Sequence, residues 1–350
     1  MGPKALSPVS KPDIAGVLRL QFEQEVTMNG QSGFNRREVV VSAAAAFAAV
    51  WLGGRVVFAK SPAEADLMAK GFYKFNVGDI EVTTVFDGVW EKAHDEAFIS
   101  NATVDETKAA LKAAGQATDM VNIPFTVTFL KTGDRTIMFD SGTGAQLSPK
   151  AGRLAANMQL AGIDPKKIDT VIVTHFHPDH IFGLMEKGTN AQVYPEARII
   201  VPNTEYAFWT DAGVIGKLPE RRQGLAKRIQ ATFPTWKNVE RIEDGAEVAP
   251  GIVAAAAYGH TAGHTTYVVG SGKDQLVVLA DLTNVPALFA RHPDWHAAFD
   301  ADPQMAEASR RRVFDRVVAD NTIITGYHYG MPAAGRIEKD GNGYAYVPLA

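Results

Sequence analysis

Three imidazoles and a carboxylate gather within six residues, directly after the apolar run 171–173: His175, His177, Asp179 and His180. Neutral imidazole and carboxylate are the nitrogen and oxygen ligands that suit zinc and its first-row neighbours. His175 and His177 stand two residues apart, so they can project the same way from an extended segment. A turn at a strand end can direct all four groups to one point. The segment predicts a metal site, because a solvated polar turn gives no packing reason for such a cluster.

This H-x-H-x-D-H pattern resembles the signature of the metallo-β-lactamase superfamily. The family's other ligand motifs have counterparts in the expected order along the chain: His260 in a glycine-rich turn, Asp281 after the apolar run 276–279, and His328 after a second apolar run. One such motif alone is weak evidence. The ordered set, with most members directly after strand-like runs, is strong evidence for the resemblance.

The ligands divide between two divalent ions. One ion is expected on His175, His177 and His260, the other on Asp179, His180 and His328, with Asp281 as the bridge between them. Each ion then has four protein ligands, counting the shared carboxylate, which leaves room for a bridging water. Zinc is the expected metal, and manganese, cobalt and iron accept the same ligands.

Two ions about 3.5–4 Å apart ionise a bridging water near neutral pH and polarise a carbonyl or phosphoryl oxygen. The expected reaction is therefore hydrolysis by a metal-bridging hydroxide, with Asp179 as the catalytic group that manages the proton. No serine or cysteine nucleophile is needed. Metal-bound histidines usually donate their other N–H to a carboxylate or carbonyl. Asp140, in a strand-Asp-Ser-Gly element, is the candidate for this partner.

The resemblance narrows to the bacterial methyl parathion hydrolases, through the segments 72–75, 152–157, 207–209, 259–269 and 343–348. It implies an exported homodimer with two metals that acts on organophosphate triesters, lactones or aryl esters. Trp209 matches a ring of the family's substrate pocket. Phe176 and residues 181–182 differ from the residues that flank the family's metal turn. The substrate preference therefore does not transfer directly.

Other activities on the same fold are the alternatives. A β-lactamase would share the metals, but the sequence shows no clear basic residue placed to bind a substrate carboxylate. A thioesterase of the glyoxalase II type would continue into a helical domain after His328. A catalytically inactive binding protein is the alternative from a different class. Such proteins usually lose ligands, whereas all seven are present here.

Charge and composition argue against a nucleic-acid enzyme. The 350 residues carry 35 Lys and Arg against 39 Asp and Glu, and no basic stripe stands out. The densest basic cluster, 310–312, lies in a segment with helical spacing and is expected to be a solvated face. The chain has no cysteine, which excludes disulfides, a thiol nucleophile and thiolate ligands.

The N-terminal part carries a targeting pattern. Arg36 and Arg37 precede the alanine-rich apolar run 39–52, which resembles a twin-arginine export signal. The run is shorter than the roughly 20 residues that span a membrane. We expect an extension and export signal over 1–65, read by the twin-arginine machinery, and a hydrolase domain over 66–350 in the periplasm. A Sec signal, an uncleaved anchor and a buried helix are the alternatives.

Strands and helices that would position these ligands alternate along the rest of the chain. A hairpin is expected over 72–87, turning at Gly78 and Asp79, and a helix is expected over 103–114 with Thr103 as its N-cap. Further elements follow: strands at 125–130, 136–140, 169–173, 251–258, 265–270, 275–280 and 322–326, and helices at 153–161, 219–232 and 303–320. This pattern predicts an α/β domain, a metallo-β-lactamase-like αβ/βα four-layer sandwich with the metals at the strand ends.

Overall fold

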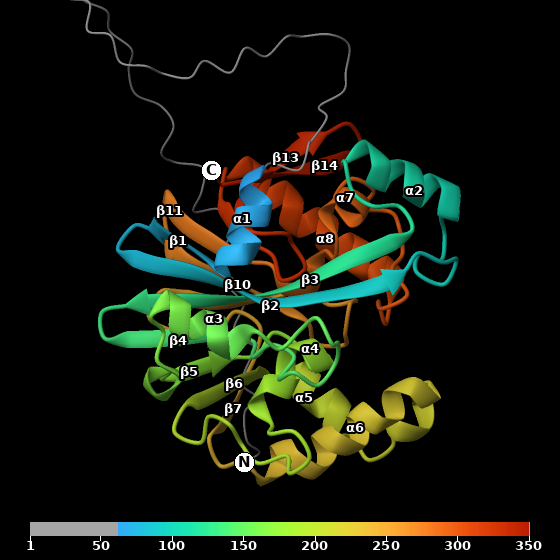
Figure 1. The fold of residues 1–350 in the computed structure, drawn as a ribbon. Coiled ribbons are helices and arrows are strands. Elements are labelled where there is room, and N and C mark those ends of the chain that lie inside the picture. The colour runs from blue at the N-terminus through green and yellow to red at the C-terminus, as the bar shows by residue number, and fades with distance from the viewer. Residues whose placement is uncertain (1–61, 350) are drawn as a thin grey trace, which may run out of the picture. The chain divides into compact units, whose positions relative to one another are not determined.

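Two seven-stranded sheets form the centre of the computed structural model, which describes residues 62–349 (Figure 1). The first sheet runs in chain order and contains β1 (Phe72–Val77), β2 (Ile80–Ala93), β3 (Met120–Thr132), β4 (Arg135–Phe139), β5 (Thr170–Ile172), β6 (Arg198–Pro202) and β7 (Val239–Ile242). The second sheet also runs in chain order and contains β8 (Glu247–Ala249), β9 (Ile252–Ala256), β10 (Thr265–Ser271), β11 (Asp274–Val278), β12 (Ile323–Thr325), β13 (Ala334–Asp340) and β14 (Gly343–Pro348). Strands β4 to β7 are parallel, and so is the pair β11 and β12.

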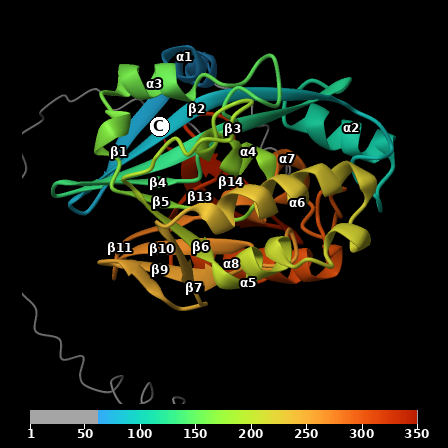
Figure 2. The ribbon, with the colours of Figure 1, turned by 90° about the horizontal axis from the view of Figure 1, so that it is seen from below.

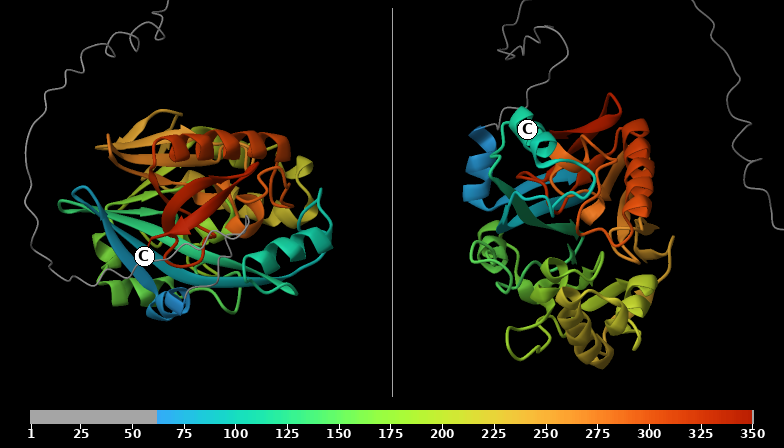
Figure 3. Two further views of the ribbon diagram at one scale, coloured as in Figure 1. Left: turned by 90° about the horizontal axis from the view of Figure 1, so that it is seen from above. Right: turned by 90° about the vertical axis from the view of Figure 1, so that its right-hand side faces the viewer.

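Helices pack on the outer faces of both sheets: α1 (Pro62–Lys70), α2 (Val104–Ala113), α3 (Leu154–Ala161), α4 (Pro178–Ile181), α5 (Asn203–Thr210), α6 (Glu220–Thr232), α7 (Pro286–Phe289) and α8 (Pro303–Ala319). Met158 of α3 and Ile229 of α6 belong to the core on the outer face of the first sheet. Phe314 and Val317 of α8 belong to the core on the outer face of the second sheet. Figure 2 shows the layers from below, and Figure 3 shows α8 over the second sheet.

The parallel strands are buried on both faces. Val171 and Val173 pack toward the helices, whereas Ile172 between them packs into the core between the two sheets. The same alternation places Ile200 between the sheets, where it meets side chains of the second sheet such as Tyr267. Strands covered on both faces read as continuous apolar runs. The four-layer αβ/βα sandwich predicted from the sequence is confirmed.

The local signals also give the expected elements. The hairpin of β1 and β2 pairs Val77 with Ile80 across Gly78, which has a positive φ of 55° that favours glycine. Thr103 caps α2 with a complete capping box, in which the Glu106 side chain binds the Thr103 backbone N–H. Strands β2 and β3 are longer than predicted, and a register shift beside Gly88 interrupts their pairing.

Helix α1 begins at Pro62, a few residues before the expected start of the hydrolase domain at 66. The predicted export signal lies outside the described residues. Within residues 62–349, none of the helices has the length and apolar character that crossing a bilayer requires.

The structure corrects one expectation about the basic cluster 310–312. Arg310 is 2% exposed rather than part of a solvated face. Its guanidinium donates to the backbone carbonyls of Leu282, Pro293 and Trp295, so it ties α8 to the loops that follow β11. Arginine has five donors in a rigid fork, which lets one buried side chain satisfy several carbonyls. The charge pattern alone does not reveal this role.

Candidate metal centre

Loops at the strand ends bring the predicted ligands together from both sheets. His175 and His177 follow β5, and Asp179 and His180 lie in the short helix α4 directly after them. The second sheet contributes three ligands from three separate places: His260 between β9 and β10, Asp281 in the 3-10 turn after β11, and His328 after β12. The site therefore lies where the ends of the two sheets meet.

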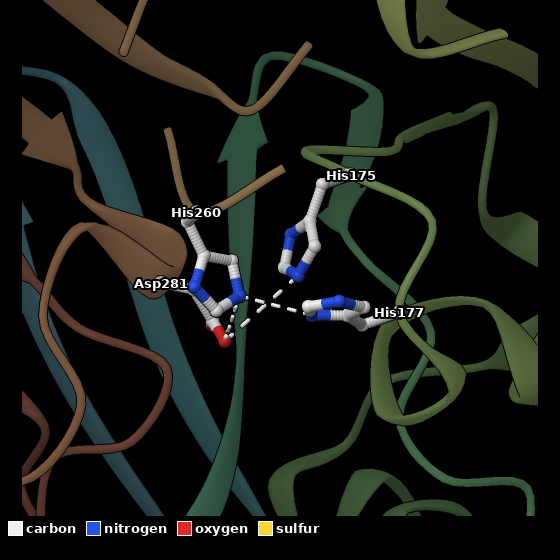
Figure 4. A group of neighbouring side chains, drawn as sticks. All are labelled: His175, His177, His260 and Asp281. Carbon is white, nitrogen blue, oxygen red and sulfur yellow. Dashed lines mark hydrogen bonds and ion pairs between the residues drawn. The ribbon is translucent and has the colours of Figure 1, made fainter. Parts of the chain in front are cut away.

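One group consists of His175, His177, His260 and Asp281, whose candidate ligand atoms lie within 4.8 Å of one another (Figure 4). The His260 Nε2 and His177 Nδ1 atoms are 2.9 Å apart. Asp281 Oδ2 lies 3.2 Å from His260 Nε2 and 3.8 Å from His175 Nε2. Three imidazoles and a carboxylate thus surround one point, which is a ligand set typical of zinc.

The second group consists of Asp179, His180, Asp281 and His328. Asp281 Oδ1 lies 3.0 Å from His180 Nε2, and Asp281 Oδ2 lies 2.8 Å from His328 Nε2. Asp179 Oδ2 lies 3.3 Å from His180 Nε2 and 3.4 Å from His328 Nε2. Asp281 belongs to both groups. The two groups contain the same seven residues that the sequence predicts as ligands, in the same division.

Hydrogen bonds determine which ring nitrogen of each histidine faces the centre. The Nδ1 atoms of four histidines contact protein oxygens at 2.8–3.0 Å: His175 with Thr174 Oγ1, His180 with Asp140, His260 with Asp300, and His328 with the Pro124 carbonyl. Carboxylate and carbonyl oxygens only accept, and the Thr174 hydroxyl already donates its proton to Asp140, so these Nδ1 atoms donate and each Nε2 faces the centre. Metal-binding histidines have this arrangement.

Buried polar atoms without a partner show that cations fit the site. His175 Nε2, His180 Nε2 and Asp281 Oδ1 are buried and form no hydrogen bond, although His180 Nε2 and Asp281 Oδ1 lie 3.0 Å apart. A buried polar atom without a partner costs about 1–3 kcal/mol. All three atoms point into the two ligand groups. Divalent ions bound there would satisfy them, so the donor set fits two metal ions.

Asp140 supports both ligand groups from behind. Its Oδ2 atom accepts from His180 Nδ1 at 2.8 Å and from the Thr174 hydroxyl at 2.9 Å, and that hydroxyl in turn contacts His175 Nδ1. Its Oδ1 atom accepts from the Thr174 backbone N–H. Asp140 has a φ of 62°, a conformation that aspartate tolerates better than most residues. The structure thus places Asp140 where the sequence analysis expects a partner of the ligand histidines.

Electrostatics divide the buried histidines into two types. Burial and the neighbouring charge of His180 lower the pKa of His175 well below its usual range. Burial also opposes charge on His260, but hydrogen bonds with Asp281 and Asp300 raise its pKa to about 9. Burial raises the pKa of Asp281, whereas His180 and other histidines lower it well below its usual range overall. Cation binding would replace the proton on a histidine whose pKa is raised, such as His260.

Two residues near the site were not singled out in the sequence. Asp300 accepts from His260 Nδ1 at 2.9 Å and lies 3.5 Å from the buried Arg310 guanidinium. Arg222 of α6 donates to the Phe299 carbonyl at 2.8 Å, and burial, His260 and, to a smaller extent, the charge of Arg222 lower the pKa of His177. The charge of one basic side chain thus acts on a ligand histidine, although the sequence showed no clear candidate. An isolated charged residue in a loop or helix, such as Asp300 or Arg222, belongs to no sequence motif that would predict its place near the centre.

His264 is not a ligand, in agreement with the expectation that it binds locally. Its Nδ1 donates to the Ala257 carbonyl, and its Nε2 accepts from the Asp281 backbone N–H at 3.1 Å. Burial and the charge of His260 lower its pKa to about 3, so the ring is neutral. His264 thus holds the backbone of the shared ligand Asp281.

Trp209 does not lie where a substrate wall requires it. The side chain is 1% exposed and belongs to the core between the first sheet and the helices. Its Nε1 donates to the buried carboxylate of Glu205 at 2.7 Å. A ring without exposed surface offers no contact area to a substrate, so the expected role as a pocket wall is wrong for this structure. The aromatic motif alone does not distinguish a pocket ring from a core ring.

The contact between Asp300 and His260 makes a first prediction possible. Asp300→Ala is expected to lower the affinity for the ion on His260 by about 10–100-fold, because partners of ligand histidines usually contribute this much. Competition with a chelating indicator measures the affinity. Asp302→Ala is the matched control, since Asp302 caps α8 through Met305 and its side chain contacts no ligand. Equal metal loss in both variants would contradict the assignment.

Comparison with known proteins places this site in a family. The family model described as the metallo-β-lactamase superfamily matches residues 125–325, which is more than half of the chain. The chain belongs to the metallo-β-lactamase superfamily. Both the fold and the seven ligands agree with the resemblance seen in the sequence.

Several relatives of the chain are lactonases. The N-acyl homoserine lactonase AiiB of Agrobacterium fabrum (strain C58) is 25% identical over 154 residues, 38% of this chain and 52% of AiiB. The match thus spans about half the length of that relative. AidC, a dizinc quorum-quenching lactonase solved with the product N-hexanoyl-L-homoserine, is 26% identical with a TM-score of 0.72, over 80% of this chain and 98% of AidC. The hydrolase AbOPH of the β-lactamase superfamily has a TM-score of 0.74 at 23% identity, over 80% of this chain and 98% of AbOPH, and this likeness shows the fold alone.

Proposed function

We propose that the protein is a metal-dependent hydrolase that cleaves lactones and aryl esters, with slower cleavage of organophosphate triesters. The observation that carries the proposal is the pair of four-residue ligand groups that share Asp281. When bound, two divalent ions activate water near neutral pH and polarise the bond under attack. The lactonase relatives support the substrate class, because AidC is similar over most of this chain.

Asp179 is the carboxylate best placed to move a proton. Its side chain is 15% exposed, compared with 3% for Asp281, so it alone of the two reaches solvent. The Tyr327 hydroxyl donates to the Asp179 backbone carbonyl at 2.6 Å and fixes the segment. In lactone hydrolysis, the water oxygen bonds to the carbonyl carbon and the bond from that carbon to the ring oxygen breaks. Asp179 would take the proton from water and deliver it to the departing oxygen.

A β-lactamase is the second candidate, and Arg222 favours it. A guanidinium is a strong partner for the carboxylate of a β-lactam. Burial and His260 lower the pKa of His177 and the charge of Arg222 adds to this effect, but one of the Arg222 N–H groups already binds the Phe299 carbonyl. A substrate panel that includes a β-lactam therefore distinguishes the two functions.

The panel compares the zinc-loaded protein on an acyl homoserine lactone, an aryl acetate, an organophosphate triester and a β-lactam. We expect kcat/KM to be highest for the lactone or the aryl ester, lower for the triester and undetectable for the β-lactam. Treatment with a chelator should abolish every activity, and zinc should restore it. Activity on the β-lactam alone would replace the proposal by the second candidate.

We also propose that the protein is an exported homodimer, because the resemblance to the methyl parathion hydrolases implies both properties. Light scattering after size-exclusion chromatography would measure the mass in solution. A mass close to the 37.7 kDa of one chain would contradict the dimer.

A further inference from the structure

Glu205 is a fully buried carboxylate that accepts four hydrogen bonds, two on each oxygen. Its Oε1 atom accepts from the Phe176 backbone N–H at 2.9 Å and from Trp209 Nε1 at 2.7 Å. Its Oε2 atom accepts from the Thr261 hydroxyl and from the Gly263 backbone N–H, both at 2.7 Å. All four neighbours donate, which suits an ionised carboxylate.

Three of these donors come from the two loops that carry the histidines of the first ligand group, and the fourth, Trp209, lies one turn after Glu205 in α5. Phe176 lies between His175 and His177, and Thr261 directly follows His260. One carboxylate thus bridges the loop after β5, on the first sheet, and the loop before β10, on the second sheet. At the base of these two loops the Thr265 backbone N–H also donates to the Thr174 carbonyl at 3.2 Å, whereas nearer their tips Glu205 joins the backbone of one loop to that of the other.

The backbone is shaped for this contact. A Cβ atom added to Gly263 would lie 2.2 Å from the Glu205 backbone nitrogen, closer than real Cβ atoms come. Any larger residue would push the His260 loop away from α5. The Phe176 ring packs at 4.5 Å from Phe233, which fixes the other loop against the helical layer. Close approach on both sides keeps the carboxylate between the loops.

We propose that Glu205 is a positioning residue that sets the separation of His175 and His177 from His260, and so determines the metal affinity of the first ligand group. The proposal rests on the two-metal site of the proposed function. Glu205 does not contact the ligand side chains themselves. It acts through the backbone of the loops, and the second group has no contact with it. The expected effect is therefore selective for one of the two metal positions.

Glu205→Gln tests the proposal, because the amide keeps one acceptor oxygen and turns the other toward two donors as an NH₂ group. Metal-free protein is titrated with Co²⁺, and paramagnetic NMR follows the ring N–H signals of the ligand histidines. Signals of His175 and His260 report the first group, and signals of His180 and His328 report the second. We expect the affinity of the first ligand group for Co²⁺ to fall by about 10–100-fold, as for other residues that orient metal ligands. The affinity of the second ligand group should stay unchanged.

Two further variants separate positioning from general stability. Thr261→Val removes one donor from Glu205 while keeping the side-chain shape, and it should weaken the first group alone to a smaller extent. Asp87→Asn is the matched control, since Asp87 is also fully buried and accepts from Thr143 and Leu154 without touching either first-group loop. Asp87→Asn should lower the melting temperature and leave the affinity of the first ligand group for Co²⁺ unchanged.

The outcomes keep this inference distinct from the proposed function. A wild-type protein that binds two Co²⁺ ions, together with a Glu205→Gln variant that has unchanged affinities or an equal loss at both groups, would overturn the role of Glu205 alone. A wild-type protein that binds no Co²⁺ and hydrolyses no ester would overturn the proposed function as well.

Discussion

Asp281→Ala is expected to release most of both metal ions from the purified protein. Asp281 is the carboxylate shared by the two ligand groups, and its oxygens lie 2.8–3.2 Å from the Nε2 atoms of His180, His260 and His328. Removing one partner of a buried charge pair costs about 3–5 kcal/mol. At 1.4 kcal/mol per factor of ten, the affinity for each ion should fall by about 10²–10⁴-fold. Metal analysis by mass spectrometry, together with the hydrolysis rate, measures the loss.

A matched control for this variant lies at the start of β11, the strand that leads to Asp281. Asp274→Ala changes an exposed aspartate at the opposite end of β11, far along the strand from the ligand. It should keep two ions per chain and the wild-type rate. Wild-type protein treated with a chelator gives the metal-free reference rate, which Asp281→Ala should approach. Two full equivalents of metal in Asp281→Ala would refute the bridging assignment.

Replacing both Arg36 and Arg37 with lysine should abolish export, although it preserves the charge. Twin-arginine signals are addresses read by a receptor, and the planar guanidinium is not interchangeable with an ammonium group at such a site. The hydrolase should then accumulate in the cytoplasm with its activity intact. Fractionation of cells, with a cytoplasmic marker enzyme, measures the distribution.

Arg19→Lys is the control for export, because it makes the same kind of substitution outside the arginine pair and the apolar run 39–52. Periplasmic activity should remain at the wild-type level in this variant. If the Arg36→Lys, Arg37→Lys double variant also keeps full periplasmic activity, the signal is of the Sec type, and the twin-arginine proposal is wrong.

The sequence predicted the order of layers and the candidate ligand set, with the resemblance to the metallo-β-lactamase superfamily pointing to His260, Asp281 and His328. His175 and His177 stand in one short motif, and Asp281 and His328 each follow an apolar run, so local pattern places each of them at a strand end. The apolar runs of the parallel strands predict burial on both faces. These features depend on residues close together in the chain, and this is why a single sequence reveals them.

Asp140 was predicted from its motif, but only the tertiary structure decided which other residues support those ligands. Glu205 reaches Phe176 across 29 positions and Gly263 across 58, and Asp300 reaches His260 across 40. A single acidic residue in a helix or loop has the same local pattern whether it is exposed or buried. Its partners are chosen when the two sheets pack and their loops meet.

The same reason explains the two corrections. Arg310 lies in a basic run and Trp209 in an aromatic run, and neither pattern specifies which face of the helix turns inward. In the structure both side chains are buried and their donors are satisfied: Arg310 binds loop carbonyls at least 15 positions away, and Trp209 binds Glu205 one helical turn earlier in α5. A buried donor needs an acceptor. Where that acceptor lies is a property of the packed chain, which the order of residues does not show.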